Sequence, residues 1–153
     1  MLDLTIVTFG KLKEEYWQSS AQEYIKRLKP YVKIKIEELK SESFSKSNHE
    51  VAKKEEAKRL VNYLSHKLES TVFLLAEKGI ELDSWEFSNK LESIKGSIIL
   101  VIGGSLGFSE EIFKSYQKIS LSKLTFSHEL ARIILLEQLY RAVTILNKKD
   151  YHY

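Results

Sequence analysis

The chain has 153 residues, the length of one ordinary domain, so a single domain over residues 1–153 is expected. Hydrophobic residues make up 43% and charged residues 29%, which is typical of a folded globular protein and argues against a disordered one. The chain contains no cysteine, which excludes disulfides, thiolate metal sites and a cysteine nucleophile. The net charge of +3 permits a polyanionic partner without identifying one.

The first residues and the apolar segments indicate in which cellular compartment the protein is expected. The opening MLDLTIVTFGK lacks a basic start followed by a long apolar run, so no signal peptide is expected. No apolar run approaches the roughly 20 residues of a membrane-spanning helix. Together with the absence of cysteine, which suits a reducing compartment, these features favour a cytoplasmic protein without a membrane partner.

The first half of the chain alternates strands and helices. In chain order we predict a strand over 2–9, a helix over 14–29 that Pro30 ends, a strand over 32–39, a polar loop over 40–48 and a charged helix over 49–69. The last of these helices carries its apolar residues along one expected buried side, namely Val51, Leu60, Val61, Leu64 and Leu68.

The second half continues the alternation. We predict a strand over 71–76, a helix from Asp83 or Ser84 to about Ile94, an apolar strand over 97–102, a short helix capped by Ser109, a short strand over 119–121 and a long helix to about Asn147. The order predicts an α/β fold with a mostly parallel sheet and helices on both faces. The unbroken apolar run from Ile98 to Ile102 agrees, because a strand covered on both faces has no need to alternate.

The last helix is apolar over more than one stripe, which predicts burial on several sides. Two readings are open. The helix lies at the centre of the core, or its extra apolar face meets another subunit.

Three glycines follow the apolar strand, in the segment Gly103-Gly104-Ser105-Leu106-Gly107. They let the backbone turn and approach a ligand closely, although glycines also end strands for purely structural reasons. The spacing does not fit a dinucleotide-binding or a P-loop motif. Two further loops, after the strands predicted over 71–76 and 119–121, could meet this one around a small molecule.

Four segments in the right order resemble the RlmH family of SPOUT methyltransferases over essentially the whole chain. They are TIVTFGKLKEEYWQSSAQEYIKRLKPY, LLAEKGIELDSWEFSNKL, IILVIGGSLGFSEEI and LSKLTFSHELARIILLEQLYRAVTILNKKDYHY. The resemblance implies a SPOUT fold with a C-terminal trefoil knot, a homodimer, and S-adenosyl-L-methionine (SAM) bound in the knot. By position, the cofactor residues would be Leu75, Gly103, Leu121, Ser122, Lys123, Leu124, Thr125 and Phe126.

One position departs from the family pattern. The family usually has proline before the histidine of the last segment, where this chain has Ser127. Serine is a good helix N-cap, so we expect the turn to survive and the loop to be less rigid.

The resemblance implies methyl transfer to N3 of a pseudouridine in 23S ribosomal RNA. SAM brings an activated methyl group, so the protein must align donor and acceptor and help to remove the imide proton. Methylation at a pyrimidine carbon commonly needs a cysteine nucleophile, and the lack of one favours a nitrogen or oxygen acceptor.

Four residues are the candidates for catalysis: His128, Arg132, Tyr151 and His152. His128 could bind RNA or accept a proton, or simply bond to backbone in the first helical turn. Arg132 could hold a phosphate or a carbonyl oxygen, or form an interface salt bridge. Tyr151 and His152 could stack on the acceptor base or move its proton, or belong to a frayed terminus.

Other polar and aromatic residues are more simply read as structural. Arg141 is expected to pair with Glu137 at helical spacing, and Trp17 and Tyr24 to lie in the core. His49 and His66 lack the neighbours of a metal site, so no metal is expected. The residues that form a solvated surface or a phosphate-binding face are Lys11, Lys13, Lys26, Arg27, Lys29, Lys33 and Lys35.

Two alternative functions stay open. A SPOUT enzyme could instead act on tRNA, or the chain could be a non-enzymatic dimeric RNA-binding module. For the RlmH reading, the lack of an added RNA-binding domain suggests that the substrate is the assembled ribosome, which can supply the missing docking surface.

Overall fold

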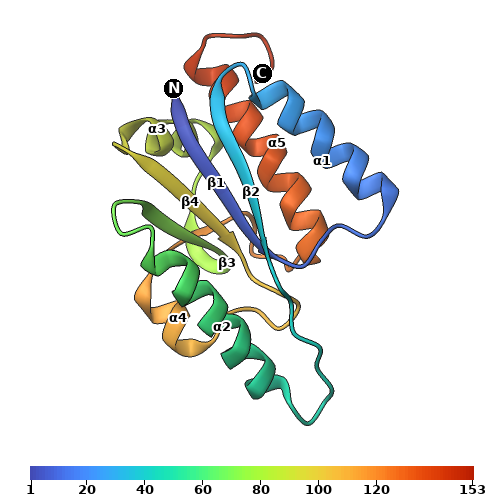
Figure 1. Ribbon diagram of the computed structural model, residues 1–153. Coiled ribbons are helices and arrows are strands. Elements are labelled where there is room, and N and C mark those ends of the chain that lie inside the picture. The colour runs from blue at the N-terminus through green and yellow to red at the C-terminus, as the bar shows by residue number, and fades with distance from the viewer.

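The computed structural model describes all 153 residues and contains one five-stranded sheet. Its strands are all parallel and lie in the order β2-β1-β4-β3-β5 (Figure 1). Their bounds are β1 Leu2–Phe9, β2 Val32–Leu39, β3 Thr71–Glu81, β4 Ser97–Ile102 and β5 Gln117–Ser120. The parallel sheet predicted from the alternation is confirmed.

Helices cover both faces of the sheet, as predicted. Their bounds are α1 Glu15–Leu28, α2 His49–Ser65, α3 Ser84–Ser93, α4 Glu110–Ser115 and α5 His128–Leu146. On one face α5 packs against both α1 and α3, and α2 and α4 cover the other face (Figure 1). No helix combines the length and the apolar character needed to cross a membrane.

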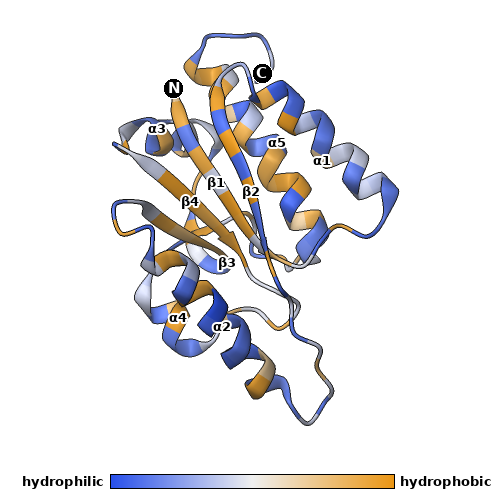
Figure 2. Ribbon diagram, viewed as in Figure 1, coloured by the Kyte–Doolittle hydropathy of each residue, from blue (hydrophilic) through white to orange (hydrophobic).

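The central strand β4 shows why its sequence does not alternate. Ile98, Leu100 and Ile102 belong to the larger core beneath α1, α3 and α5. Ile99 and Val101 belong to the smaller core beneath α2 and α4. Both sides of β4 are therefore buried, and this middle strand is apolar along most of its length (Figure 2).

Local capping signals place the starts of three helices. Asp83 and Glu86 form a reciprocal capping box at α3, in which each side chain accepts from the other residue's N–H at 2.8 Å. The Ser109 hydroxyl accepts from the Ile112 N–H at α4, and the Ser127 hydroxyl accepts from the Leu130 N–H at α5, both at 3.3 Å. Serine at 127 thus begins the last helix without the family's proline.

The prediction for α2 is wrong in its end and in part of its buried side. The helix ends at Ser65 rather than at 69, and Val51, Val61 and Leu68 are exposed. The residues that α2 buries, at strict four-residue spacing, are Ala52, Glu56, Leu60 and Leu64. One narrow stripe touches the sheet, and it includes a glutamate in place of a fourth apolar residue.

Strand β3 runs five residues beyond its predicted end and β5 is shifted from 119–121 to 117–120. Leu75 and Ile80 both pair with Ile119, so the residues between them leave the ladder. Gly79 lies in this bulge, and a Cβ there would be 2.6 Å from the carbonyl carbon of Ile119. Glycine is required because two backbones meet at this point.

The C-terminal trefoil knot that the family resemblance implies stays a prediction.

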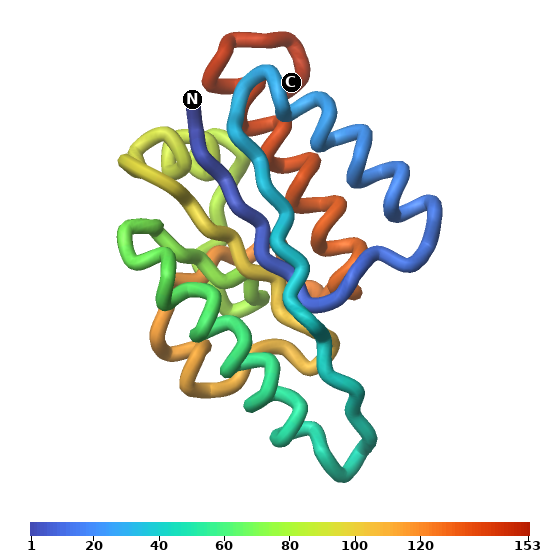
Figure 3. Tube along the Cα trace, viewed as in Figure 1, coloured from blue at the N-terminus to red at the C-terminus, as the bar shows by residue number.

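Most of the apolar surface of α5 lies in the core, and its contact with another subunit stays a prediction. Its buried side chains lie between the sheet and the two neighbouring helices, namely Arg132, Leu135, Leu136, Leu139, Ala142, Val143 and Thr144. The helix starts at the carboxyl end of the sheet, beside the last residues of β1. It ends near the opposite end, where both chain termini lie (Figure 3).

Candidate functional site

The connections of the sheet create crevices at the carboxyl ends of the strands. The chain leaves β1 and β3 toward the face with α1 and α3, but it leaves β2 and β4 toward the face with α2 and α4. Neighbouring strands whose connections go to opposite faces open a crevice between their ends. Such crevices are therefore expected between β3 and β4, between β4 and β1, and between β1 and β2.

A cavity of about 590 Å³ lies between the ends of β3 and β4. Its walls include all but one of the predicted cofactor residues, namely Leu75, Gly103, Leu121, Ser122, Leu124, Thr125 and Phe126. Lys123 is the exception, because its side chain points to solvent, where Nζ lies 3.5 Å from Glu81 Oε1. The three strand-exit loops thus meet at one cavity, as predicted.

The glycine loop shapes this cavity. A Cβ on Gly103 would lie 3.3 Å from the Phe108 ring and 3.4 Å from the Gly107 backbone, tighter than ordinary contact. Gly107 has a φ of +74° and closes a turn by donating its N–H to the Gly104 carbonyl at 2.9 Å. The loop is therefore built for close backbone approach and for a tight turn at once.

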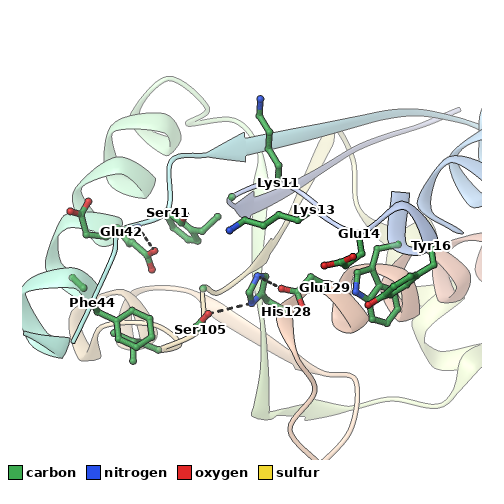
Figure 4. A pocket seen from close by; sticks show the side chains of 17 residues that line it. Lys11, Lys13, Glu14, Tyr16, Ser41, Glu42, Phe44, Ser105, His128 and Glu129 are labelled. Carbon is green, nitrogen blue, oxygen red and sulfur yellow. Dashed lines mark hydrogen bonds and ion pairs between the residues drawn. The ribbon is translucent and has the colours of Figure 1, made fainter. Parts of the chain in front are cut away.

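A second cavity, of about 440 Å³, lies between the ends of β1 and β4. Ser41, Glu42 and Phe44 approach it from one side and Glu14 and Tyr16 from the other, with Lys11 and Lys13 on the β1 side (Figure 4). The two cavities share walls, formed by Gly104, Ser105, His128 and Glu129. The two cavities are therefore adjacent at the start of α5.

His128 stands at this junction. Its Nε2 lies 2.7 Å from Glu129 Oε1, and its Nδ1 lies 3.4 Å from the Ser105 hydroxyl (Figure 4). A neutral histidine that donates Nε2–H to the carboxylate presents Nδ1 as an acceptor. The pair Glu129–His128 is thus arranged to take a proton at Nδ1.

The model of the family "Predicted SPOUT methyltransferase" matches residues 2–152. A protein of Kosmotoga olearia named ribosomal RNA large subunit methyltransferase H is 38% identical, over 99% of this chain and all of the relative. The chain belongs to the RlmH family of SPOUT methyltransferases. A relative of the same name from Acetivibrio thermocellus is 40% identical, over 97% of this chain and 98% of the relative.

Solved structures agree with the SPOUT fold. A probable methylase family protein of Haemophilus influenzae Rd KW20 superposes with a TM-score of 0.59 at 14% identity, over 95% of this chain and 66% of that chain. TrmJ of Z. mobilis ZM4 superposes with a TM-score of 0.55 at 9% identity, over 93% of this chain and 70% of that chain. Identities this low support the fold alone.

Arg132 lines neither cavity of this RlmH-family chain. Its side chain is 4% exposed and donates to Glu38 Oε2 at 2.9 Å, to Thr8 Oγ1 at 2.8 Å and to the Gly10 carbonyl at 3.1 Å. The guanidinium therefore ties the start of α5 to the ends of β1 and β2. Arg132 therefore forms its salt bridge with Glu38 of the same chain, and not across a subunit interface.

Tyr151 and His152 lie at the opposite end of α5 from His128. The Tyr151 hydroxyl donates to Glu137 Oε1 at 3.0 Å, and Nδ1 of His152 is 3.2 Å from a guanidinium nitrogen of Arg141. Arg141 also pairs with Glu137, as predicted. Burial, followed by the Glu137 hydrogen bond, raises the pKa of the Tyr151 hydroxyl. These contacts hold Tyr151 and His152 against the last turns of α5.

Sequence reasoning missed Ser105, Glu129 and Glu56, which all line the second cavity. Glu129 and Ser105 show no pattern of their own and are identified only by their contacts with His128. Glu56 had a usable signal, because it is the charged member of an otherwise apolar stripe on α2. No group of three or more His, Cys, Asp and Glu side chains is placed to hold a metal ion.

Proposed function

We propose that this chain transfers the methyl group of SAM to N3 of a pseudouridine in large-subunit ribosomal RNA. The observation that carries the proposal is the junction of two crevices at His128, one suited to a donor and one to an acceptor. Full-length relatives named ribosomal RNA large subunit methyltransferase H support the choice of substrate. The site of action would be the cytoplasm.

SAM fits the cavity between β3 and β4. Leu75, Leu121 and Phe126 give it apolar walls, and backbone groups of the Gly103 and Ser122–Thr125 loops offer hydrogen bonds to an adenine. A Cβ on Gly103 would press on the Phe108 ring and the Gly107 backbone, so glycine there keeps the loop in its tight form beside the cavity. When bound, SAM supplies an activated methyl group.

His128 would accept the imide proton at Nδ1, while Glu129 holds the ring in place through Nε2. General-base help of this kind contributes about 10²- to 10⁴-fold to a rate. The acceptor base would lie in the second cavity, where Lys11 and Lys13 are placed to neutralise its phosphates.

A homodimer would let the remaining candidates contribute. α5 has 19 residues and is about 28 Å long, so His128 and the Tyr151–His152 pair cannot meet in one chain. Two chains packed in antiparallel fashion along α5 would bring the tail of one to the cavities of the other. Half-buried Ile134, Ile145 and Leu146 on α5 are available for that contact.

The net charge of +3 is modest for RNA binding, and an assembled ribosome would add docking surface.

The deciding experiment measures methyl transfer to large ribosomal subunits from cells lacking this protein, with tRNA and protein-free rRNA as competitors. Mass spectrometry of rRNA digests should show one methyl group gained on pseudouridine. Calorimetry should show SAM binding to the free protein. Methylation of tRNA without methylation of ribosomal subunits, or failure to bind SAM, would refute the proposal.

A further inference from the structure

The least expected side chain of the second cavity is the carboxylate of Glu56. It lies on the stripe of α2 that faces the sheet and is 8% exposed. The loop after β4 leaves space for this carboxylate because residue 104 is a glycine. A Cβ at Gly104 would lie 2.6 Å from Glu56 Oε1. Acidic residues are seldom buried this far unless a partner compensates for lost hydration.

The chain compensates Glu56 only in part. Oε2 accepts the Glu42 N–H at 3.0 Å, and no lysine, arginine or histidine forms an ion pair with the carboxylate. Oε1 accepts no hydrogen bond from the chain. Burial raises the pKa of this carboxyl, against the opposing effect of the Glu42 N–H. Oε1 is not among the fully buried unpaired atoms and faces the cavity, so it can accept a hydrogen bond from a ligand there.

The surroundings indicate what kind of ligand donates to Glu56. The same cavity is bordered by Tyr16, Trp17 and Phe44, whose rings suit a flat heterocycle. A carboxylate can only accept hydrogen bonds, so it selects a base edge that carries an N–H. His128, on the shared wall, is already assigned to the nitrogen that receives the methyl group.

We infer that Glu56 accepts a hydrogen bond from N1–H of the acceptor pseudouridine and so determines specificity for pseudouridine over uridine. This inference rests on the proposed function. Pseudouridine carries ring N–H groups at N3 and N1, whereas the N1 of uridine forms the glycosidic bond and bears no hydrogen. With uridine in the cavity, the Glu56 carboxylate would be desolvated and left without a donor.

The test compares methyl transfer to two preparations of large ribosomal subunits. One comes from cells lacking this methyltransferase, and the other from cells that also lack the enzyme forming the acceptor pseudouridine, so that uridine occupies the position. Wild-type protein should prefer the pseudouridine subunits by about 30-fold or more in kcat/KM, the effect of one hydrogen bond to a charged group. Glu56→Ala should bring the ratio to within about threefold of unity.

Two variants make the result specific. Glu56→Gln keeps an acceptor oxygen without the charge and should retain part of the preference. Glu55→Gln, on the exposed side of the same helix, should retain all of it. SAM affinity, measured by calorimetry, should be unchanged in all three variants.

Each other outcome has a definite meaning. Equal loss on both substrates in Glu56→Ala would show a structural role and overturn the inference, as would a wild-type enzyme that does not discriminate. A wild-type protein that binds SAM but methylates neither preparation would refute the proposed function instead.

Discussion

At the scale of single residues, the charge state of His128 decides the proposed chemistry. His128→Gln keeps a polar side chain at the junction of the cavities but cannot take up a proton. We expect kcat to fall by about 10²-fold with SAM affinity unchanged. Raising the pH should restore part of the rate, because the imide then loses its proton to solvent.

His66→Gln is the matched control, since His66 is exposed and lines neither cavity. Single-turnover assays across pH would measure both variants. An unchanged rate in His128→Gln would remove this residue from the proton transfer.

Glu56 makes a separate prediction about stability. Because burial raises the pKa of its carboxyl, the folded chain holds the proton to higher pH than the unfolded chain does. Its contribution to stability is therefore present at low pH and is lost as the pH rises through the folded pKa. Glu56→Gln does not ionise and should be more stable than wild type at pH 8.

Urea unfolding at several pH values would measure the difference between Glu56→Gln and wild type, which should shrink toward pH 4. Equal free energies of unfolding at pH 8 would show that the carboxylate is better compensated than its contacts indicate. A stabilised variant with reduced preference for pseudouridine would mark Glu56 as a residue kept for function.

Gly79 makes a prediction about the bulge of β3. Gly79→Ala places a Cβ 2.6 Å from the Ile119 carbonyl carbon, and neither backbone can move aside easily. We expect a loss of about 1–3 kcal/mol in the free energy of unfolding. Lys78→Ala, at the exposed neighbouring position, should change it by less than about 0.5 kcal/mol. Similar values for the two variants would contradict the close crossing.

At the scale of elements, Arg132 holds α5 in position over the ends of β1 and β2. Arg132→Ala leaves Glu38, Thr8 and the Gly10 carbonyl without their donor, and we expect a loss of about 3 kcal/mol. Arg132→Lys keeps the charge but not the three-way geometry, so about half of that loss should remain.

The control for Arg132 is Arg27→Lys, which changes an exposed helical ion pair and should cost less than about 0.5 kcal/mol. Chemical unfolding would give the free energies. If Arg132→Lys lowered kcat/KM without lowering stability, the residue would contact substrate after all.

The elements also show what sequence could and could not predict. Local signals placed the start of α3 at Asp83 or Ser84 and the start of α5 at Ser127, because capping bonds join residues three apart. The extension of β3 and the shift of β5 depend on pairing between segments distant in sequence. The four-residue spacing on α2 marks Glu56 as a buried position, but its contact with the loop at Gly104 depends on a segment distant in sequence.

At the scale of the whole molecule, the resemblance to the RlmH family named residues that line one cavity but could not place the catalytic candidates relative to one another. Lys123 was included because it lies within a matching segment, yet its side chain points to solvent. Tyr151 and His152 share the C-terminal segment with His128 but lie a helix length away from it. The distance between these residues follows from the path of α5 through the core, which the sequence alone does not give.

The separation leads to a prediction about the dimer. In a mixture of His128→Gln and His152→Ala chains, mixed dimers contain one site with both native residues. Each variant alone should be impaired, and mixing equal amounts should restore about a quarter of wild-type activity, since half the dimers are mixed and each holds one intact site of two.

Size-exclusion chromatography with light scattering would confirm the dimer and the exchange of chains. A monomer in solution, or a mixture no more active than its components, would show that Tyr151 and His152 do not complete the site of a partner.

The shared wall at β4 also constrains how such enzymes can change. The loop from Gly103 to Gly107 borders both cavities, so under the proposed function a substitution there would disturb the binding of donor and acceptor together. The far side of the acceptor cavity, around Phe44 and Glu56, touches only one of them. New acceptor specificities should therefore arise by exchanging the end of β2 and the first turns of α2, which makes that segment the rational place to retarget the enzyme.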